Sequence, residues 1–187
     1  MSSTSQDCCA SDRTDRALPR RVAQDLADRL NGVLNRTVSD SRLSVAAIAG
    51  YPDVFELARV VNEDKAPLEL DGVPLCLFVK HVVAIEDGRC RTDSYSYRLQ
   101  PVGSRKSWLI RWEYMRDPPR GDYAYPPAHV HVNATFADGT PAGRLHVPTA
   151  PVSLELVLRH LITDWNVNPR AEDWEDILGQ SAAGFDG

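Results

Sequence analysis

Three histidines are the side chains in this sequence that are best suited to chemistry. His129 and His131 lie two residues apart in Tyr125-Pro-Pro-Ala-His-Val-His-Val-Asn133, and His146 follows in the next short apolar segment. An imidazole has an ordinary pKa of about 6.5, so it exchanges protons near neutral pH, and its neutral form binds metals. The spacing therefore indicates either proton transfer or metal binding.

The elements around these histidines can place them on one face of a small antiparallel sheet. Successive side chains of a strand point to opposite faces, so the two histidines of the first strand share one side and its valines the other. Asp138-Gly139 predicts a turn, and residues 144–147 predict a second short strand that carries His146. If the strands pair, we expect the histidines on an open face and the valines, with Leu145, on the buried face.

The first chemistry that this arrangement allows is acid–base catalysis without a metal. Two imidazoles can take a proton from a ribose hydroxyl and return one to the leaving oxygen. A guanidinium would stabilise the charge of the transition state, and Arg111, Arg98 or Arg144 could supply it. We therefore expect His129 and His131 to be catalytic together with one of these arginines, with no cofactor.

The second chemistry is a metal centre. Histidines at positions i and i+2 of a strand, with a third from its neighbour, resemble the three-histidine centres of catalytic zinc or iron. The ligands would be His129, His131 and His146, and no Asp or Glu stands at an obvious fourth position.

Histidines that merely alternate on a solvated sheet face would give the same pattern, so a binding module without catalysis stays open. Its contact surface would be the aromatic loop of residues 118–127 or the acidic C-terminal segment.

The charge of the chain argues against binding to duplex DNA. The 187 residues carry a formal net charge of −5, whereas neutralising DNA phosphates needs an excess of Lys and Arg. Residues 98–132 are locally basic, and residues 151–187 are acidic.

We expect a cytoplasmic protein without a membrane segment. The first sixteen residues have no apolar stretch of the kind that a secretion signal needs. The most apolar run, residues 74–85, contains Lys80 and His81 and is too short to span a bilayer. Four cysteines in such a context do not predict disulfides.

The N-terminal part predicts a tail, a helix and a hairpin. Residues 1–15 are polar and should be disordered. Apolar residues at helical spacing predict an amphipathic helix over 17–35, with Pro19 in its first turn. Residues 42–62 fit either a β-hairpin or a helix-turn-helix, and their β-branched end favours the hairpin.

The clearest hairpin joins residues 75–86 to residues 89–100 through Asp87-Gly88, a dipeptide that favours a type I′ turn. In the simple two-residue register, Phe78 faces Tyr97, and Cys76 stays apart from Cys90.

The next strand, over 107–115, alternates, and four residues share one face: Trp108, Ile110, Trp112 and Tyr114. Such a row is typical of core packing against a helix, and a base-stacking platform is the alternative.

Two helices should end the chain. Ser153 is a suitable N-cap of the first and Asn166 its stop; the second should begin at Asn168-Pro169 and end at Gly179. With residues 181–187 as a flexible tail, we expect one α+β domain over 16–180. It consists of a mainly antiparallel sheet of five to seven strands, with an N-terminal helix and a C-terminal helical pair packed on one face.

Three motifs within roughly residues 94–165 resemble the TumE-type toxins of bacterial toxin–antitoxin systems: Tyr95-Ser-Tyr-Arg-Leu-Gln100, Leu109-Ile-Arg-Trp112 and Pro127-Ala-His-Val-His131. That family carries a Tyr-x-Tyr strand, an Arg-aromatic strand and a His-containing segment after a proline, in this order. The chain departs from the pattern where Glu113-Tyr114 replaces an Asp-Asn turn, and it has a long N-terminal extension.

The resemblance implies a small bacterial effector that acts on RNA and is controlled by an antitoxin-like protein partner. The family's polar residues carry over onto His129, His131 and Arg111. We expect substrate contacts from four further residues: Tyr97, Arg98, Arg144 and His146. The expected function is a toxin-like, histidine-based ribonuclease that needs no metal. A three-histidine metal protein and a non-catalytic protein-binding module are the alternatives.

Overall fold

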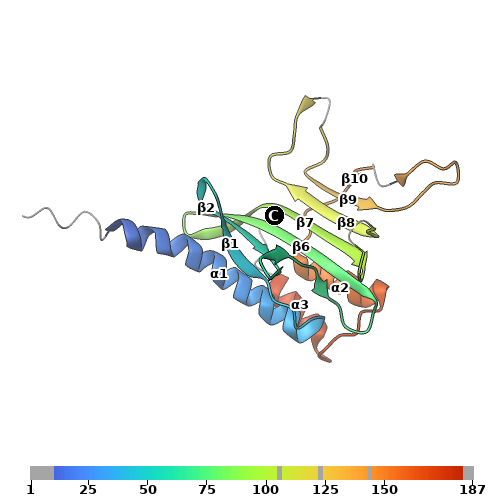
Figure 1. Ribbon diagram of the computed structural model, residues 1–187, viewed down its shortest axis with the longest axis horizontal. Helices are drawn as coiled ribbons and strands as arrows, with labels where there is room; N and C mark the ends of the chain where they lie inside the picture. The colour runs from blue at the N-terminus through green and yellow to red at the C-terminus, as the bar shows by residue number, and fades with distance from the viewer. Residues whose placement is uncertain (1–10, 105–106, 122–123, 143–144, 183–187) are drawn as a thin grey trace, which may run out of the picture.

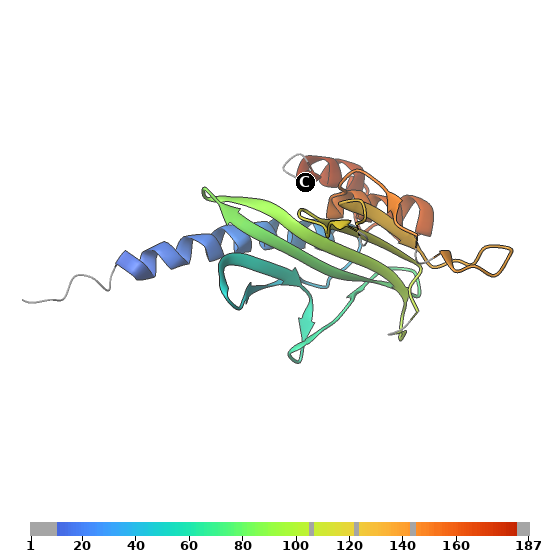
Figure 2. The same cartoon turned by 90° about the horizontal axis from the view of Figure 1, so that it is seen from above.

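The structure of the protein is a computed structural model that describes residues 11–104, 107–121, 124–142 and 145–182, and the side chains of these ranges from residue 17 onward. Cys8, Cys9 and Arg144 lie outside these ranges. An antiparallel sheet forms one layer, and three helices pack against one of its faces (Figures 1 and 2). The expected α+β class, with an N-terminal helix and two C-terminal helices, is confirmed.

Eight strands make the main sheet, in the order β1-β2-β6-β7-β8-β9-β10, with β5 paired to β6. Their bounds are β1 (Ser44–Ile48), β2 (Tyr51–Ala58), β5 (Leu68–Glu69), β6 (Leu75–Glu86), β7 (Arg89–Pro101), β8 (Ile110–Met115), β9 (Ala128–Val132) and β10 (Val147–Pro148). β3 (Val60–Val61) and β4 (Asp64–Lys65) form a separate two-stranded ribbon. The main sheet exceeds the five to seven strands expected, because the segment before β6 adds a short strand of its own.

The first helix, α1 (Ser11–Thr37), is longer than expected and contains Pro19 in its interior. A polar extension of a helix has no apolar periodicity, so the spacing of hydrophobic residues could not reveal that helix begins within the expected tail. Small residues such as Ala23 and Ala27 are fully buried, which lets the helix lie close to the sheet.

The hairpin interpretation of residues 42–62 is confirmed. β1 and β2 pair antiparallel through a tight connection in which Gly50 has a positive φ of 83°. The helix-turn-helix alternative is excluded, since these residues contain no helix.

The long hairpin of β6 and β7 also forms as expected. Asp87 and Gly88 have φ values of 51° and 74°, and a type I′ turn requires both to be positive. Cys76 and Cys90 stay apart, and both thiols are free.

The register of this hairpin departs from the expected one after a few pairs. One extra residue in β7, Asp93, creates a β-bulge that shifts the remaining pairs by one. Phe78 therefore pairs with Arg98, and the expected pairing with Tyr97 is wrong. As a result, Arg98 shares the face of Phe78, whereas Tyr97 points to the helices and is fully buried.

The aromatic row of the next strand is divided between the two faces of the sheet. Trp112 and Tyr114 are buried in the core, as expected. β8 begins only at Ile110, so Trp108 precedes the strand and does not follow its alternation of side chains. Trp108 lies on the face opposite to Trp112, beside Arg111.

The C-terminal helices are α2 (Leu154–Trp165) and α3 (Trp174–Ala182). Ser153 caps α2 by accepting a hydrogen bond from the Leu156 amide at 3.2 Å, and Asn166 stops it in the left-handed conformation, as expected. The second helix begins later than Asn168-Pro169 and continues past Gly179. Among the described residues, no helix is long and apolar enough to cross a membrane.

A buried polar network on the helix side predicts how stability depends on pH. His81 is 4% exposed; its Nδ1 lies 3.0 Å from the Tyr97 hydroxyl and its Nε2 lies 3.1 Å from the Thr92 hydroxyl. Burial, aided by the charge of Arg29, lowers the pKa of His81 to about 4.

In the unfolded chain His81 has an ordinary pKa of about 6.5. Between this value and the lower pKa of the folded state, the unfolded chain binds a proton that the folded protein does not bind. The contribution of His81 to the free energy of unfolding should be fully present above about pH 6.5 and should decrease as the pH falls toward 4. Between pH 7 and pH 5 we expect a loss of about 2 kcal/mol from this residue. Urea unfolding of the wild type and His81→Gln at both pH values checks this, since the variant should lose less. Equal losses in both proteins would contradict it.

Candidate functional site

The three histidines singled out by the sequence converge in the structure. β10 pairs with β9 so that Val147 lies opposite Val130, which brings His146 beside His131. The ligand nitrogens of His129, His131 and His146 all lie within 4.8 Å of one another. Their ring centroids form a triangle with sides of 5.0, 4.7 and 4.6 Å. These residues are called the histidine cluster below.

The burial of the two sheet faces differs from the expectation. His129 and His131 are each only 3% exposed, whereas Val132, Leu145 and Val147 are 43–49% exposed. The expected open face is therefore wrong for His129 and His131, whereas His146 is exposed, as expected. Of the residues expected on the buried face, Val130 is partly buried against the core, and the other three are exposed. Two buried imidazoles in contact with each other indicate a specific binding or catalytic site, unlike histidines that alternate on a solvated surface.

Aromatic side chains from neighbouring loops cover the cluster. The Tyr125 ring stacks on His146 at 5.0 Å, with an interplanar angle of 6°, and meets His129 edge-on at 5.0 Å. Trp108 meets His131 edge-on at 6.4 Å. On the other side, the valine face borders an open cleft between β8, β9 and α2, lined by Ile110, Trp112, Val130 and Leu156 among others.

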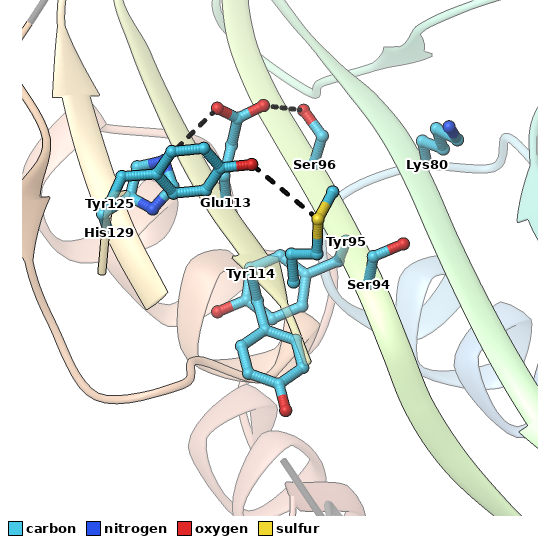
Figure 3. Close-up of a pocket in the computed structure, with 9 residues that line it drawn as sticks. Lys80, Ser94, Tyr95, Ser96, Glu113, Tyr114, Tyr125 and His129 are labelled. Carbon is cyan, nitrogen blue, oxygen red and sulfur yellow. Dashed lines mark hydrogen bonds and ion pairs between the residues drawn. The ribbon is translucent and has the colours of Figure 1, made fainter. Parts of the chain in front are cut away.

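A carboxylate that the sequence analysis missed completes the cluster. Glu113 Oε2 lies 3.2 Å from His131 Nε2 and 3.6 Å from His129 Nε2. Its other oxygen, Oε1, accepts a hydrogen bond from the Ser96 hydroxyl at 3.2 Å. Figure 3 shows Glu113 between Ser96 and His129, which come from the two neighbouring strands.

The signal that could have revealed Glu113 lies in the same alternation that gave the aromatic row. If Trp112 and Tyr114 face the core, Arg111 and Glu113 must face the other way. In the observed register, β8 pairs with β9 so that Arg111 lies opposite His131 and Glu113 opposite His129. Local sequence does not show that β8 pairs with β9, and this pairing is what places Glu113 beside the histidines.

The structure brings Arg111 to the cluster, as expected. Its Nη2 lies 3.2 Å from Glu113 Oε2, the oxygen that also faces the histidines. Arg98 lies one strand further, directly opposite Arg111 on β7.

Tyr97 is not brought to the cluster. It is 0% exposed, and its hydroxyl binds His81 on the helix side of the sheet. The expectation that Tyr97 contacts substrate is therefore corrected, and the bulge at Asp93 is the physical reason for its position. Arg144, the remaining candidate, falls outside the described residues.

The hydrogen bonds of the cluster fix one proton. His129 Nδ1 lies 2.8 Å from the Pro126 carbonyl oxygen, and because a carbonyl only accepts, this nitrogen carries the proton. Nε2 is then the ring nitrogen that is available to a metal ion. Partial burial and the nearby His129 lower the pKa of His146, which favours its neutral, ligating form.

The donor set fits a divalent transition metal. Metal–nitrogen bonds of about 2.1 Å place the nitrogens of a tetrahedral site about 3.4 Å apart. The observed spread of up to 4.8 Å needs only small side-chain rotations to reach that spacing. Three imidazoles and a carboxylate suit zinc and iron in particular.

A small hollow gives access to the cluster from the side of β7. Its volume is about 160 Å³, and it is lined by Lys80, Ser94, Ser96, Glu113, Tyr125 and His129 among others (Figure 3). A small molecule in this hollow would lie against Glu113 and His129.

The resemblance to TumE-type toxins stays a prediction. No protein-family model, no curated protein and no solved structure matches the chain.

Proposed function

We propose that His129, His131, His146 and Glu113 bind a divalent transition metal and that the protein is a metal-dependent enzyme. The observation that carries this proposal is the grouping of three imidazole nitrogens within 4.8 Å of one another. A carboxylate oxygen of Glu113 lies 3.2 and 3.6 Å from two of these rings. The Pro126 carbonyl supports it, because metal-bound histidines usually donate their second N–H to such a group.

Each residue has a distinct part in this proposal. His129 and His131 come from β9 and supply two rigid ligands, and His146, the residue before β10, closes the site. Glu113 completes the coordination and offsets part of the charge of the ion. A metal held this way lowers the pKa of a bound water and polarises a substrate oxygen.

A second candidate is metal-independent acid–base catalysis by His129 and His131. The 3.2 Å pair of Glu113 with His131 favours it, since a carboxylate stabilises a protonated imidazole. Under this candidate the protein is a cytoplasmic, toxin-like bacterial effector that cleaves RNA and is held in check by an antitoxin-like protein partner. Arg111 would stabilise the transition state.

Metal analysis of the purified full chain tests the first proposal. After loading with Zn²⁺ or Fe²⁺ separately, we expect one ion per chain for at least one of them. His129→Ala and His131→Ala should each lose the ion, and Glu113→Gln should weaken binding by about 10- to 100-fold. The matched control is His160→Ala, because His160 lies on α2 and pairs with Asp164.

Retention of the wild-type stoichiometry by His129→Ala, or loss of the ion from His160→Ala as well, would contradict the metal site. Circular dichroism of each variant confirms that the fold is intact.

Cleavage of single-stranded RNA distinguishes the two candidates. If the metal takes part, activity should appear with the loaded protein and fall by at least about 100-fold in excess EDTA. If acid–base catalysis operates, activity should survive EDTA and disappear in the His129→Ala/His131→Ala double variant. An absence of cleavage under both conditions would reject RNA as the substrate. The metal analysis alone would then decide whether the histidine cluster binds a metal.

A further inference from the structure

Two arginines lie side by side next to the histidine cluster. Arg98 on β7 and Arg111 on β8 are directly opposite each other, and His131 on β9 is the next residue in the same row across the sheet. All three point away from the helices. Like charges placed directly opposite on neighbouring strands repel each other, so a protein keeps such a pair only where something offsets the repulsion.

The described part of the chain supplies too little negative charge for this pair. Arg111 contacts the Glu113 carboxylate, which also faces two histidines. Within the described residues, no carboxylate forms an ion pair with Arg98. In addition, the Nε atoms of both arginines are enclosed and have no hydrogen-bond partner there. Enclosed N–H groups without acceptors cost free energy.

Aromatic rings hold both guanidinium groups in place. The Cζ atom of Arg98 lies 4.8 Å from the centroid of the Phe78 ring, and that of Arg111 lies 5.3 Å from a Trp108 ring. A contact of this kind orients the planar guanidinium and leaves terminal N–H groups that can donate to an anion, although one terminal nitrogen of Arg111 already pairs with Glu113. The pair is therefore a preformed set of N–H donors beside the cluster.

We propose that Arg98 and Arg111 bind the phosphoryl group of a phosphate-ester substrate and hold it against the histidine cluster. The inference rests on the proposed function, because the cluster would act on the phosphate that the arginines hold. A carboxylate is fully bound by one bidentate arginine, whereas the several oxygens of a phosphoryl group can accept from two guanidiniums at once. Two adjacent arginines therefore favour a phosphate ester over a carboxylic acid.

Lys80 is a weaker candidate for the same task. It lines the hollow beside the cluster, but it has a counterion of its own, Glu56, at 4.0 Å. Arg98 has no such counterion among the described residues, so the anion should bind at the arginine pair.

Calorimetric titration of the full chain with inorganic phosphate tests the inference. We expect millimolar binding by the wild type, with or without bound metal, and at least about tenfold weaker binding by Arg98→Gln, since a charge-assisted hydrogen bond is lost. Arg89→Gln is the matched control, because Arg89 is an exposed arginine at the other end of the same strand. Acetate should bind at least about tenfold more weakly than phosphate.

Equal phosphate binding by Arg98→Gln and Arg89→Gln, or equal binding of acetate and phosphate by the wild type, would overturn the inference. Adenosine monophosphate and a diadenylate dinucleotide, each compared with adenosine, identify the ester as a monoester or a diester. If neither binds more tightly than adenosine in an Arg98-dependent way, the phosphate-ester assignment is wrong.

Metal content measured on the same samples separates this inference from the proposed function. Arg98→Gln keeps all four metal-binding side chains, so its metal stoichiometry should equal that of the wild type. If the wild type binds metal and Arg98→Gln binds phosphate as tightly as the wild type, the inference is refuted but the proposed metal site is not. Conversely, Arg98-dependent phosphate binding by a wild type that holds no metal would refute the metal centre and uphold the anion subsite.

Discussion

The candidate site depends on the register of β8 between its two neighbours. Backbone pairing places Glu113 between Ser96 and His129, and Arg111 between Arg98 and His131. A slip of one residue would turn both charged side chains toward the helices and bring Trp112 to the histidines. The aromatic core prevents that slip, because Trp112 and Tyr114 fill the space against the helices. The register that buries the apolar face therefore also assembles the polar one.

The polar face is arranged at some cost to stability. His129 and His131 are nearly as buried as the hydrophobic core, and enclosed N–H groups of Arg98 and Arg111 have no partner among the described residues. Each such unpaired group costs about 1–3 kcal/mol. Groups retained against stability are where function is to be sought.

The sequence predicted the elements well and their mutual pairing less well. Helical spacing, the turn at Asp87-Gly88 and the caps of α2 are local signals, and all three were confirmed. The meeting of the three histidines also followed from strand alternation. The bulge at Asp93 and the pairing of β8 with β9 depend on contacts between distant segments. For that reason Tyr97 was misplaced, Glu113 was missed, and the burial of His129 and His131 was not foreseen.

The two chemistries that the cluster supports place different demands on its third histidine. Acid–base catalysis needs one protonated and one neutral imidazole, and the single carboxylate of Glu113 is enough to stabilise that state. A metal needs all the ligating imidazoles to be neutral, and partial burial beside His129 keeps the pKa of His146 low. A pair of catalytic histidines leaves the third ring only a contact with the substrate, whereas a metal uses it as a ligand. Because β10 contributes only a short strand that brings His146 to the cluster, the presence of His146 favours the metal.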